Sequence, residues 1–333
     1  MLAPRARPLL TTFFSTPRSR KGDTMTQVAT PAPRVIESRA RRSRFFEKLA
    51  PYGFVAPVSA LILVLMIIPI AIVIGFSTFD NVIMTPESNF TGLQNYVTIL
   101  NDGTFYIAAR NSLFFTLGSV AAHLVIGLAF ATMLNTRLLS PLIKAIFRAL
   151  FILPWLFTVA IIAVLWRMLL NPNGIINYLL ISSGVIDVGV EWLSSRDTAL
   201  LAVTFINVWA GYPFFMVSLL AGLQGIPRDL YEAATVDGAG PWQQFWNVTL
   251  PQLRPIILSM VILDMIWTSQ QFPLIWLTTG GGPINSTEML PTYTYKLAFS
   301  TYEFGLASAS AVIILLLSMV LAFFYVRHQK VRD

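Results

Sequence analysis

The sequence contains no cysteine and only two histidines among its 333 residues. The absence of cysteine excludes disulfides, thiolate zinc sites and cysteine nucleophiles. With His123 and His328 as the only imidazoles, we expect no histidine-rich metal site. Charged residues are also scarce, at 12% of the chain. The sequence therefore offers few of the groups from which catalytic and metal centres are built, and we expect neither a metal nor a cofactor.

Apolar residues take the place of these missing groups. Hydrophobic residues make up 55% of the chain, and the mean hydropathy is +0.67. Both values lie well outside the range of ordinary soluble domains. They predict an integral membrane protein whose main solvent is the lipid bilayer.

The positive charge is concentrated at the N-terminus. Of the 23 lysines and arginines, eleven lie before Pro51, in a stretch rich in proline, serine and threonine. We interpret residues 1–50 as a disordered basic tail, with either Met1 or Met25 as the start of translation. A basic run beside an apolar span is typical of the cytoplasmic side of a membrane, where it contacts anionic lipid. We therefore favour a membrane role for this charge over nucleic-acid binding.

Six apolar stretches are long enough to cross a bilayer as helices. They are Val55–Phe76, Ser112–Leu134, Ala149–Trp166, Thr198–Leu223, Ile256–Leu277 and Gly305–Val326. Lysine and arginine are concentrated in the N-terminal tail, in every second connection after it and in the C-terminal tail. The positive-inside rule therefore places both termini in the cytoplasm. We predict an all-α integral membrane protein with six transmembrane helices over residues 51–328 and a cytoplasmic tail over 329–333. A non-cytoplasmic connection is predicted to hold a turn and a short amphipathic helix at residues 173–180.

A polar segment from Tyr231 to Gly240 separates the fourth and fifth apolar stretches, in a connection predicted to be cytoplasmic. Pro227 suits the first turn of a helix, because its missing N–H is not needed there. Gly238 allows the left-handed conformation that ends a helix. A second short helix is predicted over residues 242–250, before Pro251. The pattern predicts a compact helix–turn–helix that projects from the membrane, and its alternative is a capped interfacial loop without a partner.

The motif within this segment is more specific than its helix signals. It consists of Glu232-Ala233-Ala234, then Asp237-Gly238-Ala239, Gln243, Phe245 and Leu250-Pro251. This run resembles the cytoplasmic signature loop of the permease subunits of binding-protein-dependent ABC importers. Supporting stretches at residues 92–96, 111–116 and 278–283 are similar to the carbohydrate-uptake branch of that family. The resemblance covers residues 50–328, which leaves only the two tails outside it.

In that family the loop, here residues 224–255, carries a coupling helix that sits in a cleft of the ATP-hydrolysing subunit. The resemblance implies this ATPase-coupling role for Glu232, Ala233, Ala234, Asp237, Gly238, Ala239 and Pro251. It also implies two copies of an ATP-binding subunit, a second homologous permease and an extracytoplasmic solute-binding protein as partners. The sequence has no Gly-x-x-x-x-Gly-Lys-Ser/Thr phosphate loop, so we expect ATP to bind the partner and not this chain.

Polar and aromatic residues inside the apolar stretches are candidates for lining a solute pathway. They are Asp264, Trp267, Gln270 and Gln271 on the fifth stretch, and Asn207, Trp209 and Tyr212 on the fourth. Amides suit neutral hydroxylated solutes, and aromatic faces cover the C–H surfaces of such solutes. Taken singly, each residue is more typical of helix packing, whereas the cluster on the fifth stretch favours lining.

Neighbouring residues carry further expectations. Gly211 and Pro213 are predicted to break the fourth helix and free backbone groups. Asp264 either lines the pathway, pairs with a helix of the partner permease or lies near the cytoplasmic end of its span. His123 is predicted to be a hydrogen-bonded packing residue and not a proton relay.

We expect a non-catalytic permease subunit, in the plasma membrane of a bacterium, that imports a sugar or a related polyol. A proton- or ion-coupled secondary transporter is the first alternative, but it should show several intramembrane acids. A membrane-embedded enzyme would need acids, histidines or arginines gathered at one membrane surface. Only the loop resemblance argues against a scaffold protein. Monosaccharide, disaccharide and glycerol phosphate all remain open as solutes.

Overall fold

The computed structural model describes residues 55–80, 83, 88–136 and 138–330 of the chain. The chain divides into two units, Met1–Ile62 and Leu63–Asp333. The described residues of the first unit begin an apolar helix that runs from Val55 to Phe76. The predicted tail of residues 1–50 lies outside the described residues, as does most of the predicted tail 329–333.

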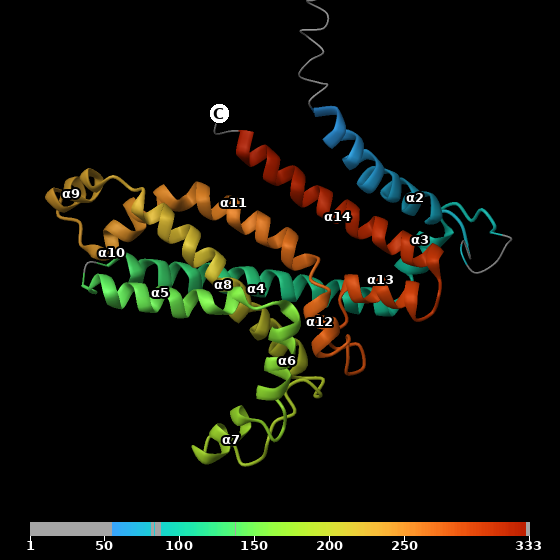
Figure 1. The fold of residues 1–333 in the computed structure, drawn as a ribbon, viewed down its shortest axis with the longest axis horizontal. Coiled ribbons are helices and arrows are strands. Elements are labelled where there is room, and N and C mark those ends of the chain that lie inside the picture. Colours follow the sequence, from blue (N-terminus) through green and yellow to red (C-terminus); the bar gives the residue numbers. More distant parts are fainter. Residues whose placement is uncertain (1–54, 81–82, 84–87, 137, 331–333) are drawn as a thin grey trace, which may run out of the picture. The chain divides into compact units, whose positions relative to one another are not determined.

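The described part of the second unit is built from helices, with one isolated antiparallel bridge between Phe79 and Phe90 (Figure 1). The helices are α2 (Ile68–Phe76), α3 (Gln94–Leu100), α4 (Gly103–Asn135), α5 (Pro141–Leu156), α6 (Val159–Leu169), α7 (Ile175–Ser182), α8 (Ala199–Gln224), α9 (Arg228–Val236), α10 (Pro241–Gln244), α11 (Leu250–Ser269), α12 (Pro273–Thr278), α13 (Leu290–Phe299) and α14 (Phe304–Lys330). Two π-helical turns, η1 (Leu63–Ile67) and η2 (Phe245–Thr249), precede α2 and α11. The prediction of an all-helical chain is confirmed for the described residues.

Among the described residues, five helices are long and apolar enough to cross a membrane, or six if α5 and α6 together form one span. Val55–Phe76, α4 and α14 contain the first, second and sixth predicted stretches, and α8 contains the fourth except for Thr198, which is its N-cap residue. Helix α4 begins at Gly103, earlier than the predicted Ser112, because the Asp102 side chain accepts a hydrogen bond from the Thr104 N–H at 2.8 Å and caps it.

The third predicted span, Ala149–Trp166, is not one straight helix. The chain bends by 99° between α5 and α6. Phe157 and Thr158 are extended at this bend, and Pro154 removes a hydrogen bond from the last turn of α5. Helix α6 then packs against α12, which lies far along the chain. Composition alone could not predict the bend, because all of these residues are apolar or neutral.

The fifth predicted span, Ile256–Leu277, and the predicted helix end before Pro251 were both misplaced. The helix is continuous from Pro241 to Ser269. The wider turn η2 ends at Thr249, two residues before Pro251, and changes the hydrogen-bond register, so the missing N–H of Pro251 does not end the helix. The chain leaves the helix after Ser269, and α12 begins separately at Pro273.

Helix α8 also differs from the prediction. Pro213 lies inside an unbroken helix that runs from Ala199 to Gln224, so the predicted break is absent. Membrane helices tolerate proline where neighbouring helices support the freed backbone groups. Here α4 packs along α8 and α5 packs on another part of it.

The centre of the second unit is the α4–α8 pair, with α11 packed against both helices. Its largest fully buried side chains include Phe215, Met216 and Leu219 of α8 and Leu253 of α11, which meet Ala131 of α4. In a bilayer the lipid is as apolar as these side chains, so close packing, and not escape from water, holds the helices together.

The segment around α7 is held by one amide side chain. Asn177 is 1% exposed, and its Nδ2 donates to the carbonyls of Asn171, Pro172 and Val190. Its Oδ1 accepts from the Val190 N–H and the Trp192 Nε1–H. The short helix predicted at residues 173–180 is confirmed as α7, and Asn177 fastens it to the following loop.

We expect Asn177→Ala to destabilise the protein by about 2–3 kcal/mol, because several buried backbone groups lose their partner at once. Thermal unfolding of the purified protein in detergent measures this loss. Asn173→Ala is the matched control, since Asn173 is an exposed asparagine at the start of the same segment. Equal melting temperatures for the two variants would contradict the role given to Asn177.

Candidate functional site

A cavity of about 290 Å³ opens among α4, α5, α6, α8 and α11. Polar groups come mainly from α4, α8 and α11, and apolar and aromatic groups come from the α5–α6 bend. The lining residues are His123, Pro154, Trp155, Phe157, Val159, Ile162, Asn207, Ala210, Gly211, Phe214, Asp264, Trp267, Thr268 and Gln271. The 99° bend between α5 and α6 therefore forms one wall of this polar cavity.

A hydrogen-bonded chain lies at the polar wall. The Nδ1 atom of His123 is 2.7 Å from Oδ2 of Asp264, and its Nε2 is 3.0 Å from the backbone oxygen of Asn207. Thr268 donates from its hydroxyl to Oδ1 of Asp264 at 3.1 Å. His123, Asp264 and Asn207 are 1%, 7% and 5% exposed. This chain joins α4, α8 and α11 in the interior of the protein.

Four of the seven residues predicted for the solute pathway line this cavity: Asn207, Asp264, Trp267 and Gln271. On α8, Asn207 lies one helical turn from Gly211, so the two residues share a face of the helix. On α11, Asp264 and Thr268 share a face in the same way, and both faces line the cavity. Within this chain Asp264 pairs with His123, and the alternative that it pairs with a helix of the partner permease stays a prediction.

The other three predicted residues point elsewhere. Trp209 packs edge-to-face on Trp166, with ring centroids 5.5 Å apart, and Tyr212 packs on Phe130 at 5.3 Å. Gln270 is exposed and donates to the Ser318 hydroxyl of α14 at 3.3 Å. None of the three lines the polar cavity.

Sequence reasoning gave His123 a packing role and Gly211 a helix-breaking role, and so missed both as cavity residues. The prediction that His123 is hydrogen-bonded is confirmed. Gly211 has no helix-breaking role. A Cβ atom there would lie 2.3 Å from Nε2 of His123, so the glycine leaves room for the imidazole. The available signal was one buried histidine and one acid within apolar stretches, but their pairing is not visible in the sequence.

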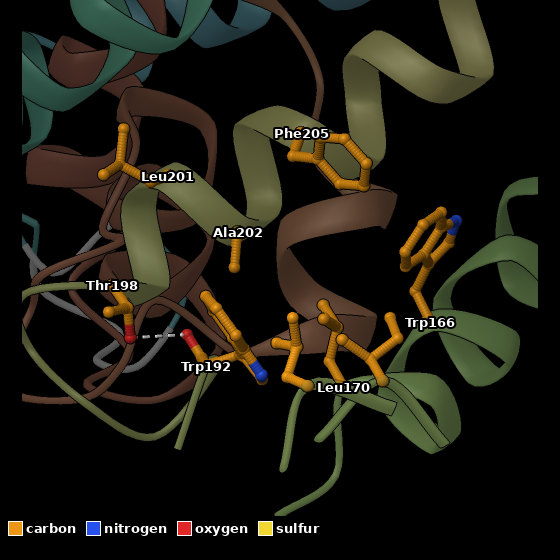
Figure 2. A pocket seen from close by; sticks show the side chains of 9 residues that line it. Trp166, Leu170, Trp192, Thr198, Leu201, Ala202 and Phe205 are labelled. Carbon is orange, nitrogen blue, oxygen red and sulfur yellow. Dashed lines mark hydrogen bonds between the residues drawn. The ribbon is translucent and has the colours of Figure 1, made fainter. Parts of the chain in front are cut away.

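A second cavity, of about 390 Å³, is lined by apolar groups of α6, α7 and α8 (Figure 2). Its only hydroxyl side chain, Thr198, donates to the backbone oxygen of Trp192 at 3.0 Å, as the dashed line in Figure 2 shows. The other lining side chains, which include Trp166, Leu170 and Phe205, are aliphatic or aromatic. The indole N–H of Trp166 has no hydrogen-bond partner among the described residues, but this cavity offers no amide or carboxyl side chain to a hydroxylated solute, unlike the polar cavity.

The loop between α8 and α11 forms the helix–turn predicted from the sequence. Pro227 precedes α9, and Gly238 follows it with a φ of +81°. The Ala239 N–H donates to the Ala234 oxygen and the Gly238 N–H to the Thr235 oxygen, which is the Schellman pattern of helix termination. Glycine suits this position because its left-handed conformation strains residues that carry a Cβ atom.

Most of the residues predicted for coupling lie on the outside of this loop. Glu232, Ala233, Asp237, Gly238 and Pro251 are exposed, whereas Ala234 and Ala239 are half-buried. Two large apolar side chains beside them, Val236 and Trp242, are 88% and 72% exposed. The loop therefore presents both apolar and acidic groups on its surface.

Internal hydrogen bonds hold this loop in shape. The side chain of Gln244 donates to the Thr235 hydroxyl and to the Ala239 oxygen, at 2.9 and 3.1 Å. The Tyr231 and Thr249 hydroxyls are 2.9 Å apart and join α9 to η2. A third cavity, of about 480 Å³, lies beside α9 and is separate from the polar cavity of His123 and Asp264. Its lining includes the side chains of Lys144, Arg228 and Glu232.

Residues 123–331 match the family described as "Binding-protein-dependent transport system inner membrane component". The trehalose/maltose transport system permease protein MalF of Thermococcus litoralis is 35% identical over 282 residues, which are 84% of this chain and 92% of that protein. The probable ABC transporter permease protein YurN of Bacillus subtilis is 33% identical over 285 residues, covering 85% and 97%.

A solved structure shares the fold. A chain in the crystal structure of a bacterial ABC transporter involved in the import of the acidic polysaccharide alginate superposes with a TM-score of 0.74. Its sequence is 22% identical, and the match covers 87% of this chain and 100% of that one. The family match spans more than half of the chain, and the relatives match most of its length. The chain therefore belongs to the inner-membrane components of binding-protein-dependent transport systems, which are ABC transporter permeases.

Proposed function

We propose that this chain is the transmembrane subunit of an ATP-driven importer for a sugar or related polyol, in the plasma membrane of a bacterium, and that it forms half of the translocation pathway. The observation that carries the proposal is the polar cavity, where Asn207, Asp264 and Gln271 lie among aromatic side chains. Amide and carboxylate groups hydrogen-bond to hydroxyls, and aromatic faces cover the C–H surface of a sugar ring. The similarity to a trehalose/maltose permease supports the same solute class.

The membrane arrangement in this proposal has six spans and both termini in the cytoplasm. It treats α5 and α6 as a single broken span, which is compatible with their joint length and hydropathy. Broken helices are tolerated at membrane depth where they line a cavity, and this bend does so. The loop that contains α9 then lies in the cytoplasm, on the side favoured by the charges of the connections.

Coupling to the ATPase is proposed to run through α9. Its small residues Ala233 and Ala234 let a partner surface approach closely, and Glu232 offers a carboxylate to a basic group of that partner. Asp237, Gly238 and Ala239 end the helix, while Pro251 lies where the loop continues into α11. The mode of binding is a helix in a groove. The exposed side chains of Val236 and Trp242 would add apolar area to that contact.

The assembly proposed around this chain has two ATP-binding subunits, a second homologous permease and an extracytoplasmic solute-binding protein. The chain is non-catalytic, and the energy comes from ATP hydrolysis in the partner. Closure of the ATPases moves α9, and the helices change between inward-facing and outward-facing arrangements.

Affinity purification tests this assembly directly. We expect the chain, tagged at its C-terminus and extracted from native membranes in mild detergent, to recover an ATPase, a second permease and a solute-binding protein in stoichiometric amounts. Mass spectrometry identifies the companions. Recovery of the chain alone, under conditions that keep a known transporter complex intact, would contradict the proposal.

Gly238 tests the coupling loop. We expect Gly238→Val to reduce ATPase co-purification, because valine is strained by at least about 1 kcal/mol in the left-handed conformation and α9 would end differently. The matched control is Gly240→Ala in the same loop. Both glycines have open space where a Cβ would lie, but only Gly238 has a positive φ. Equal ATPase recovery with the two variants would count against this assignment.

Adjacent glutamines test the polar cavity. We expect Gln271→Leu to raise the KM for sugar uptake by about two- to tenfold, the effect of losing one hydrogen bond. Gln270→Leu should leave the KM unchanged, because that side chain lies outside the cavity. Uptake of radiolabelled maltose and trehalose by cells that express the complete importer provides the measurement. A larger effect at Gln270 than at Gln271 would reject the cavity as the solute path.

A further inference from the structure

The role of His123 extends beyond packing. It lies on α4, but each of its ring nitrogens contacts a group on another helix. Those two helices, α8 and α11, carry Asn207 and Asp264, the polar residues at the cavity wall. The position of the His123 imidazole therefore affects the positions of both Asn207 and Asp264.

The hydrogen bonds determine the charge of this group. A backbone carbonyl only accepts, so Nε2 of His123 must carry a hydrogen to bond to the Asn207 oxygen. A single proton then lies between Nδ1 and the Asp264 carboxyl group, 2.7 Å apart. Whichever atom holds that proton, the His123–Asp264 pair has no net charge.

The polar wall consequently has no net charge and offers a hydrogen-bond acceptor and a hydrogen-bond donor at different positions. Among the described residues that line the cavity, none is lysine or arginine. Asp264 provides acceptor oxygens, and Nδ2 of Asn207 is a buried donor for which the described residues offer no hydrogen-bond partner. An unpaired donor costs free energy when buried, and a bound hydroxyl oxygen would satisfy it. A solute with neighbouring hydroxyls can donate to Asp264 and accept from Asn207.

The packing around the imidazole permits little movement. Gly211 faces His123 so closely that a methyl group there would overlap Nε2 and the adjacent ring carbon, at 2.3 and 2.4 Å. On another side, the ring of Phe215 lies 6.0 Å from the imidazole centroid. Gly211 and the Phe215 ring, both on α8, thus confine the imidazole in the orientation that both hydrogen bonds need.

We propose that His123 is a positioning residue of the solute site. It holds the Asp264 carboxyl group and the Asn207 backbone so that the cavity presents one acceptor and one donor without net charge, which selects uncharged solutes with neighbouring hydroxyls over anionic ones. This inference rests on the proposed importer function, which it deepens by naming the solute chemistry.

Uptake kinetics test the role, with radiolabelled maltose and trehalose as probes and cells that express the complete importer. His123→Phe keeps a ring of similar size but makes neither hydrogen bond, and we expect it to raise the KM by about tenfold or more. Asp264→Asn is expected to lose less, because a neutral imidazole can accept from the new amide and still donate from Nε2. The double variant His123→Phe with Asp264→Asn should partly recover uptake relative to His123→Phe, since no carboxylate is then left buried and unpaired.

Each outcome separates the two proposals. An unchanged KM in His123→Phe would show that the ring only fills space and would overturn the positioning role. Absence of maltose and trehalose uptake in cells with the unmodified importer would count against the proposed sugar class instead. If His123→Phe fails to reach the membrane, Gly211→Ala replaces it, because it displaces the imidazole without removing any polar group, and the same rise in KM is expected.

A spectroscopic measurement tests the geometry without any solute. In a His328→Asn background, His123 is the only histidine of this chain, so labelling histidine with ¹⁵N in this full-length chain alone gives the signals of one ring in NMR spectra of the chain embedded in lipid. We expect Nε2 to be protonated, and Asp264→Asn to shift the Nδ1 signal while leaving Nε2 protonated. An unprotonated Nε2, or an Nδ1 chemical shift that is unchanged by Asp264→Asn, would overturn the inference.

Discussion

Helices α4 and α8 pack closely along much of their length, and α5 and α11 are arranged against this pair. Near the polar cavity the approach depends on Gly211, which leaves the space that His123 occupies. Small residues that let backbones approach are a main source of helix association in lipid, where apolar burial alone gains little. Once His123 lies between the two helices, its second nitrogen bonds to Asp264 on α11. The polar wall of the cavity follows from that contact.

The cavity needs a second wall, and the bend at residues 157–158 supplies it. A straight third helix would not bring Pro154, Trp155, Val159 and Ile162 to the same opening as Asp264. The two cavities near α6 differ sharply in chemistry. One combines amides, a carboxyl group and aromatic rings, and the other is apolar with its single hydroxyl already bonded. This difference is why the solute is proposed to bind in the first.

The loop with α9 and the polar cavity lie at different points along α8 and α11, and these two helices connect them. Arg228 follows α8 by a short turn, and the chain from Pro241 to Ser269 is one continuous helix. Helices α8 and α11 also carry Asn207 and Asp264. Under the proposed function, this continuity provides a physical route from ATP hydrolysis to the solute site.

Sequence alone determined the features that depend on local chemistry. The apolar stretches identify a membrane protein, and the helix of residues 228–236 could be predicted with its end because proline and glycine act within one turn. Tertiary structure decided which polar residues meet. Gln270 and Gln271 are neighbours of identical chemistry, yet only Gln271 lines the cavity. His123 and Asp264 are 141 residues apart, and their pairing depends on how three helices pack. Side-chain direction and long-range contact arise from packing, which helix propensity and hydropathy do not encode.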